Sequence, residues 1–305
     1  MNHQFTGVIP PVITPLTADG SLDVPSLRRV INRLVEAGVD GLFLLGSSGE
    51  AVFSTDSRRR EILTAGVEIV DGRVPVLAGI IDTQTERVVE QAKAAQAIGV
   101  DALVATAPFY ALGGPEVVER HFRLIRERVN LPLFAYDIPV CVHTKLDGAM
   151  MLRLGQDSVI EGVKDSSGDD VAFRQLIRAN AAAGEPLALL TGHEVVVDGA
   201  YLGGAQGSVP GLANVCPEPY VRQWRAAQAG DWNAVRREQD QLADLMRIAS
   251  VTTGVSGYGA GVGAFKTALS MMGVIETNQM TEPVAPLDAD NSAAIAEVLR
   301  ASGLL

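Results

Sequence analysis

The sequence predicts a (β/α)8 barrel followed by a C-terminal set of helices. Short apolar segments recur about every thirty residues, helical patterns separate them, and beyond residue 216 only helical patterns remain. A solenoid of similar period would have repeats that resemble one another in sequence, and these segments do not. We therefore expect residues 1–216 to form the barrel and residues 217–305 to pack on it as helices of the same structural unit.

Eight apolar segments are predicted to form the barrel strands. Each is too short for a helix, is mostly apolar rather than alternating, and is bounded by Gly, Pro or Asp, which is typical of a parallel strand covered on both faces. In chain order they are residues 7–14, 41–46, 74–80, 101–107, 131–137, 159–165, 187–192 and 205–211.

Helical patterns separate many of these segments. Several begin with an Asp, Ser or Thr that can cap free backbone N–H groups and end on a Gly that can close the last turn. The predicted outer helices are residues 23–38, 56–70, 83–99, 115–129 and 169–184. The basic triplet Arg58-Arg59-Arg60 is expected to lie on an exposed helix face.

The C-terminal region has the same helical periodicity but no strand segments. The predicted helices are residues 219–230, 232–250, 263–273 and 291–303. The glycine-rich stretch from Gly254 to Gly263 lacks the GxGxxG spacing of a nucleotide site, and no strong strand precedes it, so a mobile loop is expected there.

Composition excludes several classes of protein. A formal charge of -11 argues against binding of nucleic acid, since basic residues are outnumbered. No segment offers eighteen clean apolar residues, and no export signal opens the chain, so neither a membrane span nor that export route is expected. The two cysteines, Cys141 and Cys216, cannot form a disulfide framework, and they fit a reducing cytoplasm.

Polar residues stand at the predicted strand ends, where enzymes with this fold place their active sites. Residues 46–50 (GSSGE), 108–110 (PFY), 136–137 (YD), 164–165 (KD) and 192–194 (GHE) follow five of the strands. All are therefore expected to face one mouth of the barrel.

Lys164 is the most informative of these residues. An ammonium group among apolar strands loses water, which favours the neutral amine, and a neutral amine can attack a ketone to form a Schiff base. The alternative is an ordinary surface lysine or an ion pair with Asp165 or Asp169. Tyr136, one βα unit earlier, favours the catalytic interpretation because a phenol there could donate and retrieve a proton, although it could also be a buried structural tyrosine.

The turn at Ser47 and Ser48 offers two hydroxyls and free backbone N–H groups that could hold a carboxylate, although serine and glycine are also common in ordinary turns. A metal site is disfavoured because the histidines and Glu194 are dispersed without paired ligand spacing. A serine hydrolase is disfavoured because residues 46–49 lack the GxSxG spacing.

Together these segments resemble the dihydrodipicolinate synthase and N-acetylneuraminate lyase superfamily of lysine-dependent pyruvate aldolases. The resemblance covers nearly the whole chain. Five ordered motifs carry it, namely GVIPPVITPLTADGSLD at the start, GSSGE, APFYA, YDIP and GVKDSSGD.

The resemblance implies roles for individual residues. Lys164 would form the imine, and Tyr136 would shuttle protons and touch the substrate carboxylate. Ser47 and Ser48 would hold that carboxylate, with Ser47 linking Tyr136 to Tyr110, which a neighbouring subunit often supplies in this superfamily. Two further positions, Gly192 and the backbone carbonyl of Val209, match residues that line the pyruvate pocket. A homo-oligomer, either a tetramer or a dimer, is also implied.

Departures from the superfamily pattern lie at the other end of the expected pocket. Dihydrodipicolinate synthases have an arginine two residues after the YNVP proline, and here Cys141 stands there, which disfavours that activity because a thiol cannot replace a bidentate guanidinium. Glu194 matches one of the acids with which sialic acid lyases bind their sugar. Asp137, in place of the usual Asn, and His143 also suggest a different second pocket.

The sequence therefore predicts a lyase that makes or breaks a carbon–carbon bond through a Lys164 imine of pyruvate or a 2-keto acid, with no metal or other cofactor. The preferred reaction is aldol cleavage of a 2-keto-3-deoxy acid to pyruvate and an aldehyde. The alternatives are dihydrodipicolinate synthase, a keto-acid dehydratase that uses the same imine, and a non-catalytic barrel that binds a keto acid.

Overall fold

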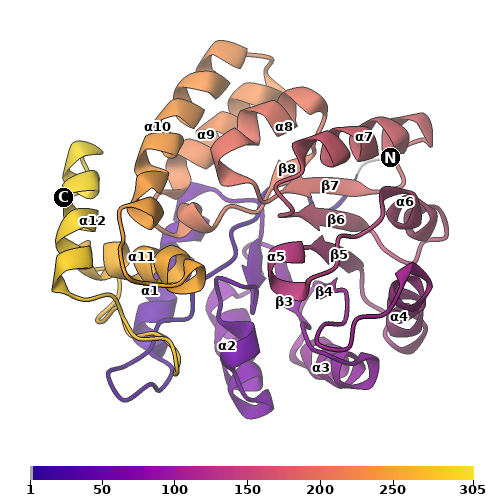
Figure 1. Cartoon of the computed structure of the whole chain (residues 1–305), viewed down its shortest axis with the longest axis horizontal. Helices are drawn as coiled ribbons and strands as arrows, with labels where there is room; N and C mark the ends of the chain where they lie inside the picture. Colours follow the sequence, from indigo (N-terminus) through magenta and orange to yellow (C-terminus); the bar gives the residue numbers. More distant parts are fainter. Residues whose placement is uncertain (1–2) are drawn as a thin grey trace.

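The computed structural model describes residues 3–305, and eight parallel strands form its central sheet (Figure 1). The strands follow the order β1-β8-β7-β6-β5-β4-β3-β2, so each pairs with its neighbour in the chain apart from the β1–β8 pair. Their bounds are β1 Gly7–Val8, β2 Leu42–Leu44, β3 Val76–Gly79, β4 Ala102–Thr106, β5 Leu133–Asp137, β6 Gly162–Asp165, β7 Ala188–Thr191 and β8 Gly207–Ser208. All eight lie within the predicted segments, so the predicted fold class is confirmed.

The chain after β1 closes the barrel against β2. Residues Pro10 and Pro11 interrupt the regular strand because proline has no N–H to donate. The pairing nevertheless continues, since Phe43 N donates to Pro10 O and Val12 N donates to Phe43 O, both at 2.9 Å. The sheet therefore has no free edge between β1 and β2.

The predicted outer helices are all present: α1 Val24–Ala37, α2 Asp56–Val70, α3 Thr85–Ile98, α4 Pro115–Arg128 and α7 Asp170–Ala182. Helix α1 shows the expected capping chemistry at both ends. The Asp23 side chain accepts from the Ser26 N–H at the start of α1, and Gly38 closes this helix with a φ of 88°, a conformation that side chains disfavour.

Six shorter elements were not predicted. They are α5 Pro139–Val142, α6 Gly148–Gln156, α8 Val197–Gly203 and the 3-10 turns Ala51–Phe53, Glu194–Val196 and Gly211–Asn214. The first two connect β5 to β6, and α8 connects β7 to β8.

The C-terminal helices α9 Pro217–Gln228, α10 Trp232–Ser250, α11 Gly257–Met271 and α12 Ala289–Ala301 gather on one side of the barrel (Figure 1). The interpretation of residues 254–263 as a loop is wrong from Gly257 onward, because α11 begins there. Each glycine destabilises a helix by only about 1 kcal/mol relative to alanine. The packing of the largely buried α11 outweighs this cost. The grouping of residues 217–305 with the barrel as one unit stays a prediction.

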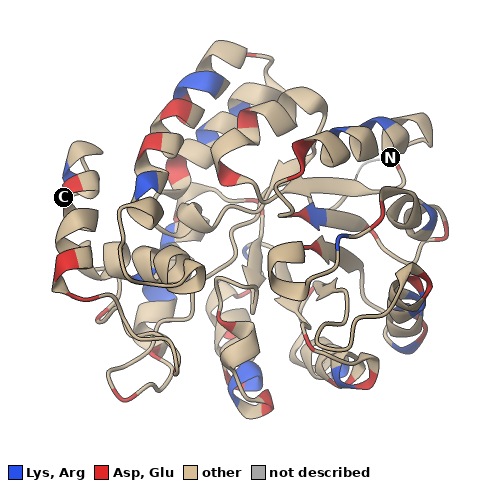
Figure 2. Ribbon diagram, viewed as in Figure 1, with Lys and Arg blue, Asp and Glu red and all other residues tan. Residues whose placement is uncertain are grey.

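Charge lies mainly on the helices and loops and is rare on the strands (Figure 2). The charged strand residues are Asp137, Lys164 and Asp165, at the ends of β5 and β6. Within residues 3–305, no helix is long and apolar enough to cross a membrane.

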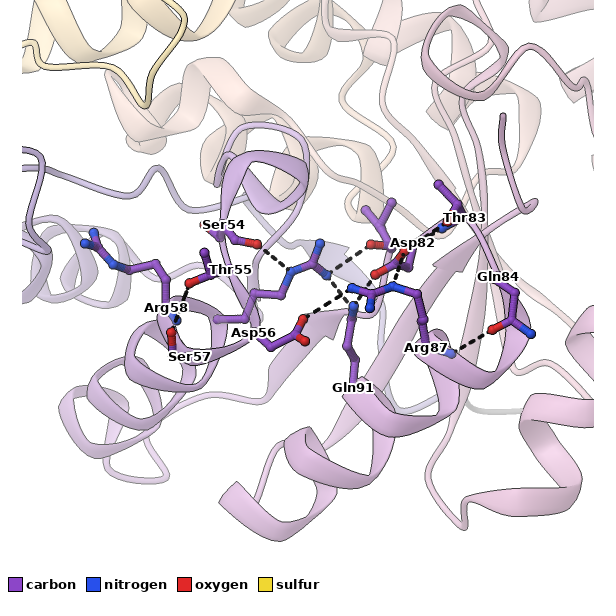
Figure 3. Close-up of polar contacts among 12 residues, drawn as sticks. Ser54, Thr55, Asp56, Ser57, Arg58, Asp82, Thr83, Gln84, Arg87 and Gln91 are labelled. Atoms are coloured by element: carbon purple, nitrogen blue, oxygen red, sulfur yellow. Dashed lines mark hydrogen bonds and ion pairs between the residues drawn. The ribbon is translucent and has the colours of Figure 1, made fainter. Parts of the chain in front are cut away.

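The basic triplet does not share one exposed face. Arg59 is buried, whereas Arg60 is exposed, because successive helical residues point about 100° apart. The Arg59 guanidinium lies between α2 and the end of β3, where it donates to Ile81 O at 3.0 Å and to the Gln91 side chain on α3. Figure 3 shows the same network, with Gln91 reaching toward Asp82.

Candidate active site

Adjacent strands bring Lys164 and Tyr136 together inside the barrel. The two residues are direct register partners on β6 and β5, so their side chains lie on the same face of the sheet. The Lys164 Nζ atom lies 4.0 Å from the centroid of the Tyr136 ring and 5.1 Å from that of Phe43. Only 5% of Lys164 is exposed, so the amine is held against two aromatic faces and largely away from water.

The amine of Lys164 has no hydrogen bond or ion pair with the rest of the described chain. Its suggested ion-pair partners are engaged elsewhere. Asp165 Oδ1 accepts from the Ser167 N–H and hydroxyl at 2.9 and 2.8 Å, and Asp169 caps α7 at the Ala172 N–H. Lys164 is therefore neither an exposed surface lysine nor paired with either of these carboxylates, and its catalytic role stays a prediction.

The serine turn after β2 reaches the same aromatic ring. Ser47 Oγ lies 3.3 Å from the Tyr136 hydroxyl, and either group can be the donor. The turn is held by its own backbone, since Gly49 N donates to Gly46 O and Glu50 N donates to Ser47 O, both at 3.1 Å. One of the two contacts expected for the proton relay, from Tyr136 to Ser47, thus exists within one chain.

Two glycines leave room around these groups. A methyl group added to Gly192 would lie 3.3 Å from Lys164 Cε and 2.1 Å from Ser166 Oγ, which is too close to be accommodated. A methyl group added to Gly211 would lie 3.2 Å from Ser48 Oγ and 3.0 Å from a Glu194 oxygen. Gly192 is therefore beside the lysine, and Ser48 and Glu194 both approach the backbone after β8.

Glu194 lies in the loop between β7 and α8. Its Oε1 accepts from the Leu212 N–H at 3.1 Å and also from the Gly211 N–H. Burial raises the pKa of this carboxyl to about 7, although the two N–H donors and nearby Lys164 oppose the shift. Near neutral pH, Glu194 can therefore either accept or donate a hydrogen bond.

Val209 follows β8 and is buried. Its N–H donates to Thr191 O at 2.8 Å, which ties it to the end of β7 beside Gly192. This position fits the expected lining of the pocket.

The structure does not bring Asp137 to the Lys164 amine. Strand alternation turns its side chain to the outer face of the sheet, where it is fully buried, forms an ion pair with Lys145 and accepts from the Leu146 N–H at 3.1 Å. Burial raises the pKa of this carboxyl, and Lys145 opposes that shift. The carboxylate already has partners, and a direct role in a second pocket stays a prediction.

Two residues near the barrel mouth are exposed. His143 closes α5 in a left-handed conformation with a φ of 55°. Cys141, on α5, is exposed as a residue, but its thiol is partly shielded from water, which raises its pKa more than nearby Lys164 lowers it.

Tyr110 is not joined to the other residues within one chain. Its exposed fraction is 94%, and its φ of 77° lies in the left-handed region that non-glycine residues avoid. The other contact of the expected relay, from Ser47 to Tyr110, is therefore absent in the described part of a single subunit.

Two residues beside the site were missed from the sequence. Tyr258 on α11 donates its hydroxyl to Ser47 O, and Lys266 on the same helix forms a buried ion pair with Glu50 at the end of the serine turn. A lone lysine within the apolar run from Gly263 to Met272 was the available signal, but it did not identify its partner.

The comparisons with known proteins agree over almost the full length. Residues 4–302 match the model of the dihydrodipicolinate synthetase family. The chain belongs to this family. It is 31% identical to a 4-hydroxy-tetrahydrodipicolinate synthase of Ralstonia nicotianae, with 99% of each chain covered. It is also 29% identical to the "Probable 2-dehydro-3-deoxy-D-pentonate aldolase YjhH" of Escherichia coli K12, again with 99% of each chain covered.

A solved structure also resembles this chain over nearly its whole length. The crystal structure of YagE, a prophage protein of the dihydrodipicolinic acid synthase family from E. coli K12 in complex with pyruvate, superposes with a TM-score of 0.93. It is 30% identical and covers 99% of each chain. The predictions of the family, of the barrel and of a lyase of the Schiff-base aldolase class are confirmed.

Proposed function

We propose that this family member cleaves a 2-keto-3-deoxy acid to pyruvate and an aldehyde through an imine at Lys164. The main support is the lysine itself. Its buried amine has no partner in the described residues, and it lies over the ring of a tyrosine whose hydroxyl contacts Ser47.

In the proposed mechanism, the neutral Lys164 amine attacks the keto carbon to give a carbinolamine. The Tyr136 hydroxyl protonates the departing hydroxyl group, water leaves, and a protonated imine remains. This leaves Tyr136 as a phenolate, which the Ser47 hydroxyl, 3.3 Å away, stabilises by donating a hydrogen bond.

The carbon–carbon bond then breaks with the imine as the electron sink. Tyr136, as phenolate, removes the proton of the C4 hydroxyl, the C3–C4 electron pair moves into the imine, and the aldehyde leaves. The resulting enamine is protonated at C3, and water releases pyruvate and the free amine. The imine lowers the barrier because no free carbanion forms.

The substrate carboxylate would bind the hydroxyls of Ser47 and Ser48 and the N–H groups of their turn. Gly192 and the Val209 carbonyl would border the keto acid. Glu194 would hydrogen-bond a hydroxyl of the variable part of the substrate, since its pKa of about 7 allows both donor and acceptor roles. The lysine imine supplies the chemistry that a cofactor or metal provides in other aldolases.

A second candidate is the synthase activity named for the R. nicotianae relative. Against it stands Cys141, because its thiol cannot form the two parallel hydrogen bonds that an arginine gives to a carboxylate. The aldolase named for YjhH supports the preferred reaction.

Chemical trapping tests the imine. The protein is incubated with pyruvate and borohydride and then weighed, and we expect a reduced pyruvate adduct on the peptide that contains Lys164. Lys164→Arg should abolish the adduct and leave the circular dichroism spectrum unchanged. Absence of an adduct on the wild-type protein would reject the imine.

A substrate panel separates the two reactions. Pyruvate release from 2-keto-3-deoxy acids of different length and stereochemistry is measured beside pyruvate-dependent consumption of aspartate semialdehyde. Consumption of the semialdehyde alone would show that Cys141, in place of an arginine, does not prevent the synthase reaction.

Tyr110 and the two free cysteines bear on how the chain assembles and in which compartment it works. We propose a homo-oligomer, a dimer or tetramer, because the exposed Tyr110 would reach a site in another subunit. The free thiols of Cys141 and Cys216 fit a reducing compartment, and we propose the cytoplasm.

A further inference from the structure

A fully buried ion pair joins the serine turn to the C-terminal helices. The side chains of Glu50 and Lys266 are 1% and 0% exposed, and their charged groups are in direct contact. Glu50 ends the turn that contains Ser47 and Ser48, and Lys266 lies in the middle of α11. The contact therefore links residues more than two hundred positions apart in the chain.

The remaining polar atoms of the pair also have partners. Glu50 Oε1 accepts from the Thr281 N–H at 2.8 Å, and Lys266 Nζ donates to Gln279 O at 2.8 Å. Taking two charges out of water costs several kcal/mol per ion, so an apolar pair of similar size often gives equal or greater stability. Stability alone is thus a poor explanation for the pair, and a role in fixing the position of the turn is a better one.

The same helix holds the other end of the turn. The Tyr258 hydroxyl donates to Ser47 O, and its ring packs against Phe53 with centroids 5.2 Å apart. Tyr258 and Lys266 are eight residues apart on α11, a separation of about 12 Å along a helix axis. One helix therefore holds the residue at each end of the turn from Ser47 to Glu50.

The turn needs such restraint because of its geometry. Glu50 has a φ of 56°, in the left-handed region that costs a non-glycine residue about 1 kcal/mol or more. At its other end, the Ser47 hydroxyl must stay within reach of the Tyr136 hydroxyl, which lies 3.3 Å away. A shift of the turn would change the length of that contact.

We infer that Glu50, Lys266 and Tyr258 are positioning residues through which α11 aligns the Ser47 hydroxyl with Tyr136 for proton transfer. The inference rests on the proposed function, since it assigns these residues to imine formation at Lys164. It gives the C-terminal helices a part in the reaction although none of the three side chains forms a hydrogen bond or an ion pair with Lys164.

The first test replaces Lys266 by Met and measures the rate constant of imine trapping at saturating pyruvate, together with kcat and KM for cleavage. We expect trapping and kcat to fall about tenfold or more, because small displacements of catalytic groups have large effects, with a smaller change in KM. The matched control is Thr267→Val. It removes the neighbouring buried hydroxyl, which accepts from the Asn278 side chain at 3.1 Å and does not contact the turn. Its rate should match that of the wild type.

Lys266→Met leaves Glu50 buried without its partner and can impair folding. The double variant Glu50→Gln/Lys266→Met removes both charges, so its Tm should recover above that of the single variant. Its trapping rate should nevertheless stay below that of the wild type. A double variant with the wild-type rate would overturn the inference, because the pair would then act on stability only.

Tyr258→Phe tests the other end of the turn and keeps the ring against Phe53. We expect a fall of about tenfold in the trapping rate with little change in Tm. A wild-type rate in this variant would contradict the inference. If the wild type itself gives no adduct, the proposed function fails instead, so the two failures are distinguishable.

Discussion

Tyr136 contributes two separate features to the site, a ring face toward Lys164 and a hydroxyl toward Ser47. Tyr136→Phe keeps the first and removes the second. We expect kcat and the imine-trapping rate to fall about 10²-fold or more, as is typical for loss of a general acid–base group. The pyruvate concentration needed for half-maximal trapping should change much less. Stopped-time borohydride trapping measures both quantities.

Tyr201→Phe is the matched control for this substitution. It removes another buried phenol hydroxyl, which lies 2.8 Å from Ser208 Oγ on the far side of β8. It should lower stability by about 1 kcal/mol and leave the trapping rate unchanged. A Tyr136→Phe protein that traps pyruvate as fast as this control would assign the proton transfer to another group.

The raised pKa of Glu194 predicts that the stability of the fold depends on pH. Its pKa rises from 4.5 to about 7 on folding, so between these values the folded chain binds a proton that the unfolded chain has lost. Stability therefore falls as the pH rises through this window, and Glu194→Gln should remove the fall. The effect is on the order of 2 kcal/mol, less than the full shift implies, because the residue keeps some exposure. Urea denaturation of both proteins between pH 4.5 and 8 measures it.

The lowered pKa of His121 has the opposite effect on stability over part of the same pH range. Burial lowers its pKa from 6.5 to about 4, so the folded chain loses a proton that the unfolded chain keeps, and stability rises with pH across that interval. The two slopes oppose each other between about pH 4.5 and 6.5. The fall due to Glu194 should therefore be steeper in a His121→Gln background, and equal pH profiles for all variants would reject both assignments.

At the scale of elements, a polar network joins α2, α3 and the end of β3 (Figure 3). Arg59 donates to Ile81 O, Ser54 O and the Gln91 side chain, and Asp82 accepts from Arg87 and Gln91. The network therefore fixes the positions of α2 and α3 relative to the end of β3.

Arg59→Lys should lower the free energy of unfolding by about 2 kcal/mol, because one ammonium cannot reproduce the fork of donors to three acceptors. Urea denaturation measures the change. The control is Arg60→Lys, the exposed neighbour on the same helix, which should stay within about 0.5 kcal/mol of the wild type. Equal stability of the two variants would mean that the bonds of Arg59 contribute nothing net.

The sequence predicts elements well where local chemistry determines them. All eight strands lie within short, mostly apolar segments, and α2 and α10 occupy the ranges that their periodicity predicts, residues 56–70 and 232–250. The site follows from the strand ends, because parallel strands place Lys164 beside Tyr136 once both are assigned. The closeness of these two residues could therefore be predicted from their positions in the sequence alone.

The remaining features depend on packing between distant segments. Nothing near Glu50 indicates that Lys266 will neutralise it, and nothing near Gly257 indicates that a glycine-rich stretch will become helical against the barrel. Asp137 is expected near a second pocket because it replaces the Asn of the superfamily motif. Its partner Lys145 could not be predicted from that replacement, and strand alternation turns the carboxylate away from Lys164.

At the scale of the whole molecule, one subunit leaves the proposed relay incomplete. Tyr110 is almost fully exposed, although it stands at the same end of the barrel as Lys164 and has a strained backbone. The loop after β4 and the start of α4 also expose Leu112 and Val117, which is unusual for large apolar side chains without a partner. A second copy that covers this loop would bury the apolar groups and bring Tyr110 to a neighbouring Ser47.

Subunit complementation tests this arrangement. Chains with Lys164→Arg and chains with Tyr110→Ala are each expected to be nearly inactive. If they are unfolded, mixed and refolded together, half of random pairs contain one chain of each kind, and in these pairs the intact Lys164 receives Tyr110 from its partner. About a quarter of wild-type activity should return in a dimer with two equivalent sites. If Tyr110 served its own chain, no mixed pair would contain a complete site, and the mixture would stay as inactive as its components.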